Sequence, residues 1–163
     1  MAIYLAALAS GPPVYVVEHE LRLEASPQEV WQVLVDTSAY PEWNPYIRKL
    51  EGKLAVGEVV RATLAQSNWP KPRTVAAQIV GVSAARELHW HGRLGIPGIL
   101  ETDHFFRIED RGRAGVIFIQ REEFRGWLAQ KMHKKGKQEH TLESFRRMNE
   151  ALAVRVAALA DAH

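Results

Sequence analysis

The sequence contains no cysteine among its 163 residues. This absence excludes a disulfide framework, a catalytic thiol and metal sites built on thiolates, and it fits a reducing compartment. The sequence also has no apolar run of the roughly 18 to 20 residues that a membrane-spanning helix requires. We therefore expect a cytoplasmic protein without stable insertion into a membrane.

An excess of charge of one sign is also missing, because the formal net charge is only +2 and basic residues are interspersed with acidic ones. We therefore expect no nucleic-acid partner. Phosphate-binding loops, nucleophile elbows and ordered Ser/His/Asp motifs are likewise absent, so we expect no nucleotide or other cofactor.

The content of hydrophobic residues, 47%, and of charged residues, 25%, is that of an ordinary folded domain. The first residues, MAIYLAALAS, are apolar but lack the basic region of a secretory signal. We expect residues 1–13 to form an N-terminal arm or an extra strand, and residues 14–163 to form a single domain.

Apolar and polar residues alternate from Val14 to Glu24, which predicts a half-buried strand. Ser26 and Pro27 then supply an N-cap and a first helical residue, and Glu29 completes a capping box, so a short helix follows. From Ile47 to Phe124, six further strand-like segments are separated by short turn sequences such as AVGE and GIPG. Such short connections favour an antiparallel meander.

The C-terminal part of the domain, residues 137–162, predicts a long amphipathic helix. Its apolar residues recur at three- and four-residue steps: Leu142, Phe145, Leu152, Val156 and Leu159, with Met148 beside them. The sheet must bury its apolar face against this helix, because no other expected helix is long enough. The sequence therefore predicts an α+β fold.

Five motifs, in this order, resemble the START-like or SRPBCC superfamily, in particular its branch of polyketide cyclases/dehydrases and lipid-transport proteins. They are VWQVLVDTSAYPEWNPYI, RELHWHG, GILETDHFFRIE, FIQREEFRGWL and ESFRRMNEALAVRV. The resemblance extends from about Val14 to Ala160. It implies the helix-grip fold of the birch-pollen-allergen type: a curved seven-stranded antiparallel sheet wraps around a long C-terminal helix and encloses a cavity. Two short helices follow the first strand.

Alternation along the strands predicts which side chains face such a cavity. One face of the segment 100–110 carries Leu100, Thr102, His104, Phe106 and Ile108. In the segment 115–124 the resemblance favours Val116, Phe118, Gln120, Glu122 and Phe124. The polar residues that we expect to face inward are His19, His104, Gln120 and Glu122, and enclosed groups of this kind often have shifted pKa values.

Our first hypothesis is that the cavity binds or transports an apolar or amphipathic small molecule, such as a fatty acyl, isoprenoid or polyketide-like compound. The expected apolar wall consists of Trp31, Tyr40, Trp43, Trp90, Phe106, Phe118, Phe145, Met148 and Leu152. The four inward polar residues either orient the ligand or only bond one another inside the protein. The aromatic segment Tyr40–Gly52 either closes the core or contacts the ligand.

Two alternatives remain open at this point. The protein could be a cyclase- or dehydratase-type enzyme in which His104 and Glu122 carry protons and Gln120 donates a hydrogen bond to a carbonyl. It could instead be a protein-interaction module whose cavity is filled by its own side chains. The sequence leaves the oligomeric state undecided.

Two further clusters have a simpler interpretation. His89 and His91 are expected to face outward without a nearby carboxylate or third ligand, so we expect no metal site. Lysines 131, 134, 135 and 137 are expected in a loop before the long helix. They could attract an anionic head group or a membrane surface near the cavity mouth, or they could simply be solvated. The turn Gly95–Gly98 could gate the entrance through Ile96 and Pro97.

Overall fold

The structure, a computed structural model, describes residues 11–162. Most of the expected N-terminal arm or extra strand therefore lies outside the described residues, and residues 11–13 form no helix or strand.

The seven strands form one antiparallel sheet in the order β1-β7-β6-β5-β4-β3-β2. Their bounds are β1 (Tyr15–Leu23), β2 (Ile47–Glu51), β3 (Val59–Leu64), β4 (Arg73–Ser83), β5 (Glu87–Leu94), β6 (Leu100–Asp110) and β7 (Val116–Arg125).

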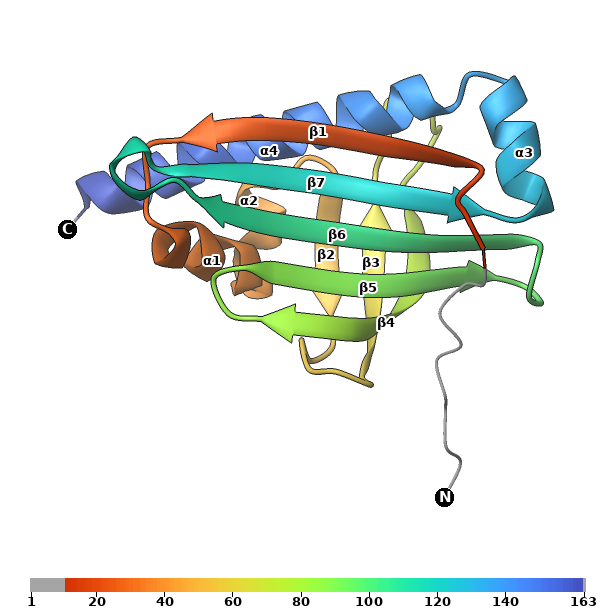
Figure 1. The fold of residues 1–163 in the computed structure, drawn as a ribbon, viewed down its shortest axis with the longest axis horizontal. Coiled ribbons are helices and arrows are strands. Elements are labelled where there is room, and N and C mark those ends of the chain that lie inside the picture. Colours follow the sequence, from red (N-terminus) through yellow and green to blue (C-terminus); the bar gives the residue numbers. More distant parts are fainter. Residues whose placement is uncertain (1–10, 163) are drawn as a thin grey trace.

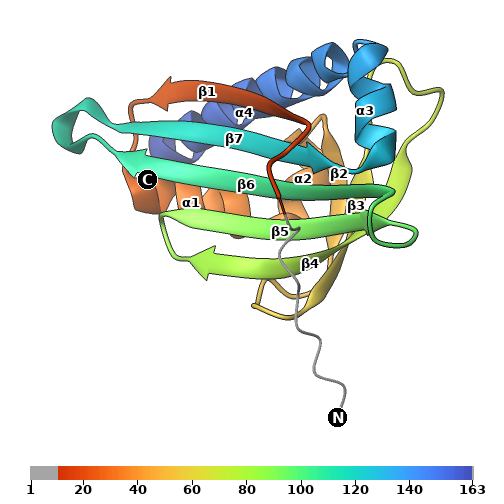
Figure 2. The same ribbon diagram turned by 45° about the vertical axis from the view of Figure 1, so that its right-hand side comes forward.

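The helices lie on the concave side and at the two ends of this sheet, which curls around the long helix α4 (Figure 1, Figure 2). The short helices after the first strand lie at one end, and α3 lies at the other. The bounds are α1 (Pro27–Val35), the 3-10 helix η1 (Thr37–Ala39), α2 (Tyr40–Trp43), the 3-10 helix η2 (Gly112–Ala114), α3 (Trp127–Lys134) and α4 (Gln138–Asp161). The predicted α+β helix-grip architecture is confirmed.

Helix α1 begins as its sequence predicts. The Ser26 hydroxyl accepts a hydrogen bond from the backbone N–H of Glu29, and the Glu29 carboxylate accepts one from the backbone N–H of Ser26. This reciprocal capping box satisfies two N–H groups that a helix start otherwise leaves without partners. Farther on, the fully buried Tyr40 donates its hydroxyl hydrogen to the Leu34 carbonyl oxygen at 2.6 Å, which fixes the chain that leaves the helix.

Helix α4 buries a face that differs in part from the expected one. Its buried residues are Thr141, Ser144, Phe145, Met148, Asn149, Leu152 and Val156. The expectation that Leu142 and Leu159 belong to this face was wrong, since both are about two-fifths exposed. Leu142 lies beside the buried row. Leu159 belongs to the last turns of the helix, where every residue from 157 to 162 is exposed.

The lysine-rich segment before α4 is not simply the expected loop, because Trp127–Lys134 forms helix α3. The helix starts on the turn between β5 and β6: the backbone N–H groups of Trp127 and Leu128 donate to the carbonyl oxygens of Gly98 and Ile99. Within this helix, Ala129 is fully buried. This short helix has few apolar residues among its lysines, so its sequence shows no clear amphipathic pattern. None of the helices described between residues 11 and 162 could cross a membrane.

Candidate functional site

A cavity of about 640 Å³ lies between the concave face of the sheet, α3 and the first turn of α4. This volume is within the range of small-molecule sites, roughly 300–1,000 Å³. Its apolar wall comes from Tyr46, Ala62, Leu64, Trp69, Val75, Ala76, Ala77, Trp90, Leu94, Leu100, Phe124, Leu128 and Met132. Its polar lining comes from Gln66, Asn68, Arg73, Thr74, Arg93, Thr102, His104, Glu122, Lys137 and Thr141.

The strand register brings His104 and Glu122 together among the lining residues. His104 on β6 pairs directly with Glu122 on β7, and on its other side it pairs with Trp90 on β5. His104 Nδ1 lies 3.6 Å from Glu122 Oε2. Both residues are less than one-tenth exposed. The pair therefore forms an enclosed polar spot in the wall of the cavity.

Burial decides the charge of both groups. It raises the pKa of Glu122 to about 8, with a smaller contribution from Asp103, while a hydrogen bond with Thr102 acts in the opposite direction. Burial also lowers the pKa of His104 to about 3. At neutral pH the site therefore holds a protonated carboxylic acid beside a neutral imidazole, because each charged form loses hydration that its neighbours do not replace.

The His104 ring is held by aromatic neighbours and by one amide. It stacks on Phe106 at a centroid distance of 4.5 Å and also contacts Trp90 and Phe145. The amide nitrogen of Gln120 lies 3.1 Å from His104 Nε2 and donates to it. Since Nε2 then accepts, the ring hydrogen of the neutral imidazole is on Nδ1, the nitrogen nearer Glu122.

Exposed basic residues also line the cavity. They are Arg73, Arg93 and Lys137. The Arg73 guanidinium carbon lies 4.6 Å from the centre of the Trp69 ring, a cation–π contact. Glu122 is the one carboxylate among the lining residues, and it is protonated at neutral pH. The cavity thus has a neutral polar interior and a cationic entrance.

Residues 15–156 match a family model described as "Polyketide cyclase / dehydrase and lipid transport". The chain belongs to this family. The predicted membership in the START-like, SRPBCC group is therefore confirmed. None of the curated proteins matches the sequence.

Solved structures resemble this member of the family over most of their length. Norcoclaurine synthase from Thalictrum flavum, in complex with dopamine and hydroxybenzaldehyde, is 16% identical with a TM-score of 0.66, covering 88% of this chain and 87% of that one. The Zhui aromatase/cyclase from Streptomyces sp. R1128 is 20% identical with a TM-score of 0.63 (90% and 93% covered). A Staphylococcus aureus protein of unknown function is 14% identical with a TM-score of 0.68 (90% and 96% covered). At such low identity these similarities show the fold alone.

The structure divides the predicted site residues into two groups. Trp90, His104 and Glu122 line the cavity. The others lie in the core or around the short helices: His19, Trp31, Tyr40, Trp43, Phe106, Phe118, Gln120, Phe145, Met148 and Leu152. Among these, Gln120 reaches the site through His104, whereas His19 accepts a hydrogen bond from Asn149 on α4. Which of them a ligand touches stays a prediction.

Several cavity residues were missed by the sequence reasoning. Tyr46 lies in the aromatic segment Tyr40–Gly52 that was singled out, so that segment both closes the core, through Tyr40, and borders the cavity. Burial raises the pKa of the Tyr46 hydroxyl well above its ordinary value. Lys137 likewise belongs to the lysine cluster. Trp69 comes from the turn between β3 and β4, where no periodic pattern indicates a direction, and Arg73 is the first residue of β4.

The outward face of the sheet corrects one expectation. His89 and His91 do have a nearby carboxylate, because Asp103 Oδ1 lies 2.9 Å from His89 Nε2 and 3.2 Å from His91 Nδ1. Arg125 donates to the other oxygen of Asp103 at 2.8 Å. Burial acts to raise the pKa of Asp103, but the two histidine contacts outweigh it and hold the pKa well below its usual range. Between residues 11 and 162, no group of three or more histidine, aspartate or glutamate side chains is placed to hold a metal ion.

Proposed function

We propose that this family member binds an apolar or amphipathic small molecule in the cavity between the sheet, α3 and α4. The observation that carries the proposal is the cavity itself: about 640 Å³, with many apolar residues in its wall and the buried polar pair His104 and Glu122 among its lining residues. Small-molecule sites commonly combine these features, since apolar area supplies affinity and a few polar groups fix orientation. A cavity of this volume does not favour the hypothesis of a filled, protein-binding module.

The charges favour one orientation of the ligand. A carboxylate placed next to Glu122 would meet buried, neutral groups and would lose its hydration without gaining a counter-charge. A neutral carbonyl or hydroxyl there can accept a hydrogen bond from the protonated Glu122. An anionic end is better placed beside Arg73 and Lys137 at the entrance. The ligand that fits best has a neutral oxygen at its deep end and, where it carries a charge, a negative one at its outer end.

Native mass spectrometry of the purified protein tests binding directly. We expect a small apolar molecule to be retained at one equivalent, or to be taken up from a panel of long-chain fatty acids and aromatic polyketides. The wild type should prefer an acid to its methyl ester, and this preference should be weaker in the double variant Arg73→Gln/Lys137→Gln, which keeps only Arg93 of the exposed lining cations. The matched control is Lys53→Gln/Arg113→Gln, which removes the same charge elsewhere. A protein that retains nothing and ignores the whole panel contradicts the proposal.

A second candidate function, acid–base catalysis on such a ligand, is supported by the neutral pair of His104 and Glu122. In a dehydration of a β-hydroxy carbonyl compound, the imidazole would take the proton from the α-carbon and Glu122 would protonate the departing hydroxyl. Water then leaves and the carbon–carbon double bond forms. The base in this step is Nε2, and the imidazolium then gives its Nδ1 hydrogen to the carboxylate across the 3.6 Å between Nδ1 and Oε2. Both groups are then neutral again, and the hydrogen left on Nε2 is accepted by the Gln120 amide oxygen after that amide rotates.

The variants His104→Gln and Glu122→Gln separate the two functions. A carrier loses at most affinity when a hydrogen-bonding group is exchanged, whereas an enzyme loses kcat with ligand binding largely kept. Binding is measured by titration, and turnover by the product formed from a β-hydroxy carbonyl probe that the protein has been shown to bind. Unchanged turnover in both variants would exclude this pair as the proton carriers.

A further inference from the structure

Exposed apolar side chains gather where the turn between β5 and β6 meets the start of α3. Leu94 is 58% exposed, Ile96 69% and Trp127 57%. Single exposed apolar residues are ordinary on protein surfaces, but several on adjoining segments indicate a contact surface. We refer to residues 94–99 and 126–137 together as the mouth platform.

The two segments of the mouth platform are joined by backbone hydrogen bonds. The N–H groups of Trp127 and Leu128 donate to the carbonyl oxygens of Gly98 and Ile99, at 2.9 and 2.8 Å. Gly126 has a φ of 99°, and a Cβ at this position would lie 2.6 Å from the Ile99 carbonyl oxygen. Only glycine permits this close approach. The exposed apolar side chains are therefore presented by one firmly connected unit.

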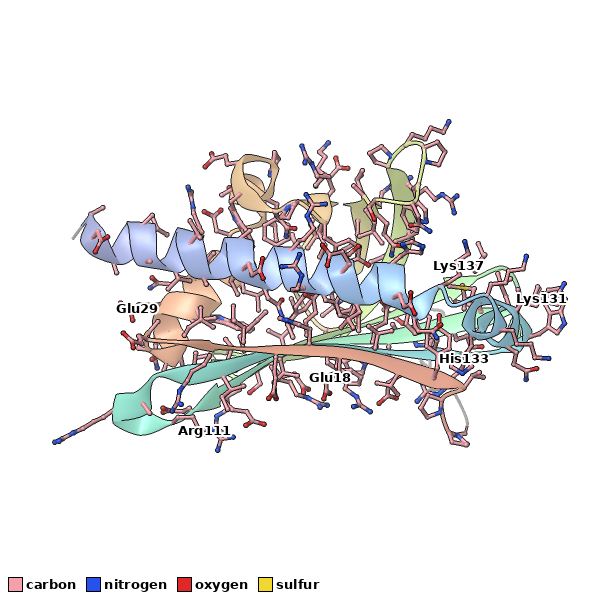
Figure 3. The ribbon with its side chains drawn as sticks, turned by 90° about the horizontal axis from the view of Figure 1, so that it is seen from above. Glu18, Glu29, Arg111, Lys131, His133 and Lys137 are labelled. Carbon is pink, nitrogen blue, oxygen red and sulfur yellow. The ribbon has the colours of Figure 1, made fainter. Side chains whose placement is uncertain are left out.

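The mouth platform is also strongly basic. It carries Lys131, Lys134, Lys135 and Lys137, and the sequence has no acidic residue from 126 to 138. The Lys131 ammonium lies 4.1 Å from the centre of the Trp127 ring, so a cation and an exposed aromatic share one spot. Figure 3 shows Lys131, His133 and Lys137 at one end of the molecule, with Glu29 and Arg111 at the other. The positive charge is thus concentrated beside the exposed apolar residues.

The same segments border the cavity. Leu94 from the turn side and Leu128, Met132 and Lys137 from the helix side are all cavity-lining residues. A flat object that covers the exposed part of the mouth platform would therefore lie against the rim of the cavity. Lysine is depleted at the centres of protein–protein interfaces, so a surface in which lysines surround the apolar residues is not typical of them. They are typical of surfaces that rest on anionic lipid, where tryptophan and aliphatic side chains enter the interface and lysines face head groups.

We propose that the mouth platform docks on the surface of an anionic lipid bilayer, with Ile96 and Trp127 in the interfacial layer and the lysines over the head groups. Docking in this orientation brings the rim of the cavity to the phase in which apolar molecules are dissolved. The proposal goes beyond ligand binding and does not depend on which ligand the cavity takes.

Vesicle flotation tests the proposal with the full chain. We expect binding to vesicles of phosphatidylcholine with one third phosphatidylglycerol, little binding to phosphatidylcholine alone, and a loss of binding at about 0.5 M salt, where charges are screened. The triple variant Lys131→Gln/Lys134→Gln/Lys135→Gln should lower the partition coefficient on the order of 100-fold, since each lysine near an anionic surface contributes roughly fivefold. The control Lys49→Gln/Lys53→Gln/Arg113→Gln, with equal charge loss outside the mouth platform, should lower it only a few-fold.

The apolar contribution is tested separately. Ile96→Ser/Trp127→Ser should weaken binding to the anionic vesicles at least tenfold, because both side chains lose their apolar burial. The matched control is Val56→Ser/Val154→Ser, at two positions that are also largely exposed. All four positions are on the surface, so thermal unfolding of the variants should change little, and native mass spectrometry should show ligand uptake unchanged.

Three results would overturn the proposal: no binding to anionic vesicles at low salt, equal effects of the platform and control variants, or equal binding to charged and uncharged vesicles. Loss of a protein partner in the platform variants, with vesicle binding unchanged, would assign the surface to that partner instead. None of these results contradicts the ligand-binding proposal, because uptake into the cavity is measured in the absence of lipid vesicles.

Discussion

His104 Nδ1 lies 3.6 Å from Glu122 Oε2, yet the two residues form a neutral pair and not an ion pair. A stable ion pair would raise the pKa of the histidine and lower that of the glutamate. Burial moves both pKa values in the opposite directions, to about 3 and about 8. Burial outweighs the short contact for both groups, and His104 lies among aromatic rings. The following predictions depend on this neutral interior.

The pH dependence of stability should reveal the protonated Glu122. Its pKa is raised from 4.5 to about 8, so the folded state holds this proton more tightly than the unfolded state. The stability that this adds is fully present below pH 4.5 and is lost as the pH rises through 8. Glu122→Gln cannot ionise, so its free energy of unfolding should rise relative to the wild type by on the order of 3 kcal/mol from pH 5 to pH 8. Urea unfolding at several pH values measures this difference.

The adjacent Glu123 supplies a control of opposite sign. Burial acts to raise its pKa, but hydrogen bonds from Arg125 and Arg121 outweigh it and lower the pKa. Its stabilising effect is therefore present above the ordinary carboxyl pKa and is lost in acid. Glu123→Gln should be less stable than the wild type by an amount that stays constant from pH 6 to pH 8. A constant difference for Glu122→Gln as well would show that Glu122 is ionised at neutral pH.

Reducing the cavity volume should weaken ligand binding without unfolding the protein. Ala77 is 5% exposed and lines the cavity, so Ala77→Leu directs three additional carbon atoms into it. We expect roughly a tenfold higher Kd for a ligand that fills the cavity, since overpacking of this kind costs about 1–3 kcal/mol. Ala157→Leu makes the same exchange on the exposed side of α4 and should leave Kd unchanged. Isothermal titration calorimetry compares the two, and equal Kd values would place the ligand elsewhere.

The hairpin between β6 and β7 contains two glycines with positive φ that should respond differently to alanine. A Cβ on Gly115 would lie 2.0 Å from the Leu23 carbonyl oxygen, and φ there is 81°. Gly112 has a φ of 58° and no neighbour within 4 Å of the added Cβ. We expect Gly115→Ala to lower the free energy of unfolding by about 3 kcal/mol or more, and Gly112→Ala by about 1 kcal/mol. Similar urea midpoints for both variants would contradict the arrangement of this hairpin.

Local signals in the sequence predicted the strands and most of the helices, and the family resemblance supplied their helix-grip arrangement. Period-two alternation marked the strands, and Ser26 with Glu29 marked the start of α1. Helix α3 was missed because it is short and rich in lysine, and because its start is fixed by Gly98 and Ile99 from a distant turn. Such contacts between segments leave no periodic signal in either segment.

The site was predicted less completely than the fold. Alternation correctly gave the inward face of β5 and β6, which includes Trp90 and His104, and the family resemblance gave that of β7, which includes Glu122. It did not distinguish an inward residue that borders the cavity from one that is buried in the core away from it, such as Phe118. That distinction depends on the position of α4 along the sheet. It also depends on α3 and on the turn after β3, whose paths no alternation pattern describes.

A pair of substitutions on the same face of the sheet tests this distinction between wall and core. Trp90 lines the cavity, whereas Phe118 is fully buried, and its ring stacks on that of Phe106 at a centroid distance of 6.3 Å. Trp90→Leu removes ring surface from the wall, so we expect Kd for an apolar ligand to rise roughly tenfold. Phe118→Leu should lower the free energy of unfolding by about 1–2 kcal/mol and change Kd less than about twofold, because the loss lies behind the wall. Unfolding in urea and calorimetric titration give both quantities for each variant.

If Phe118→Leu weakened binding as much as Trp90→Leu, the ligand would have to reach into the core around Phe118, beyond the cavity described above. The residues predicted from alternation alone would then describe the site better than the cavity does.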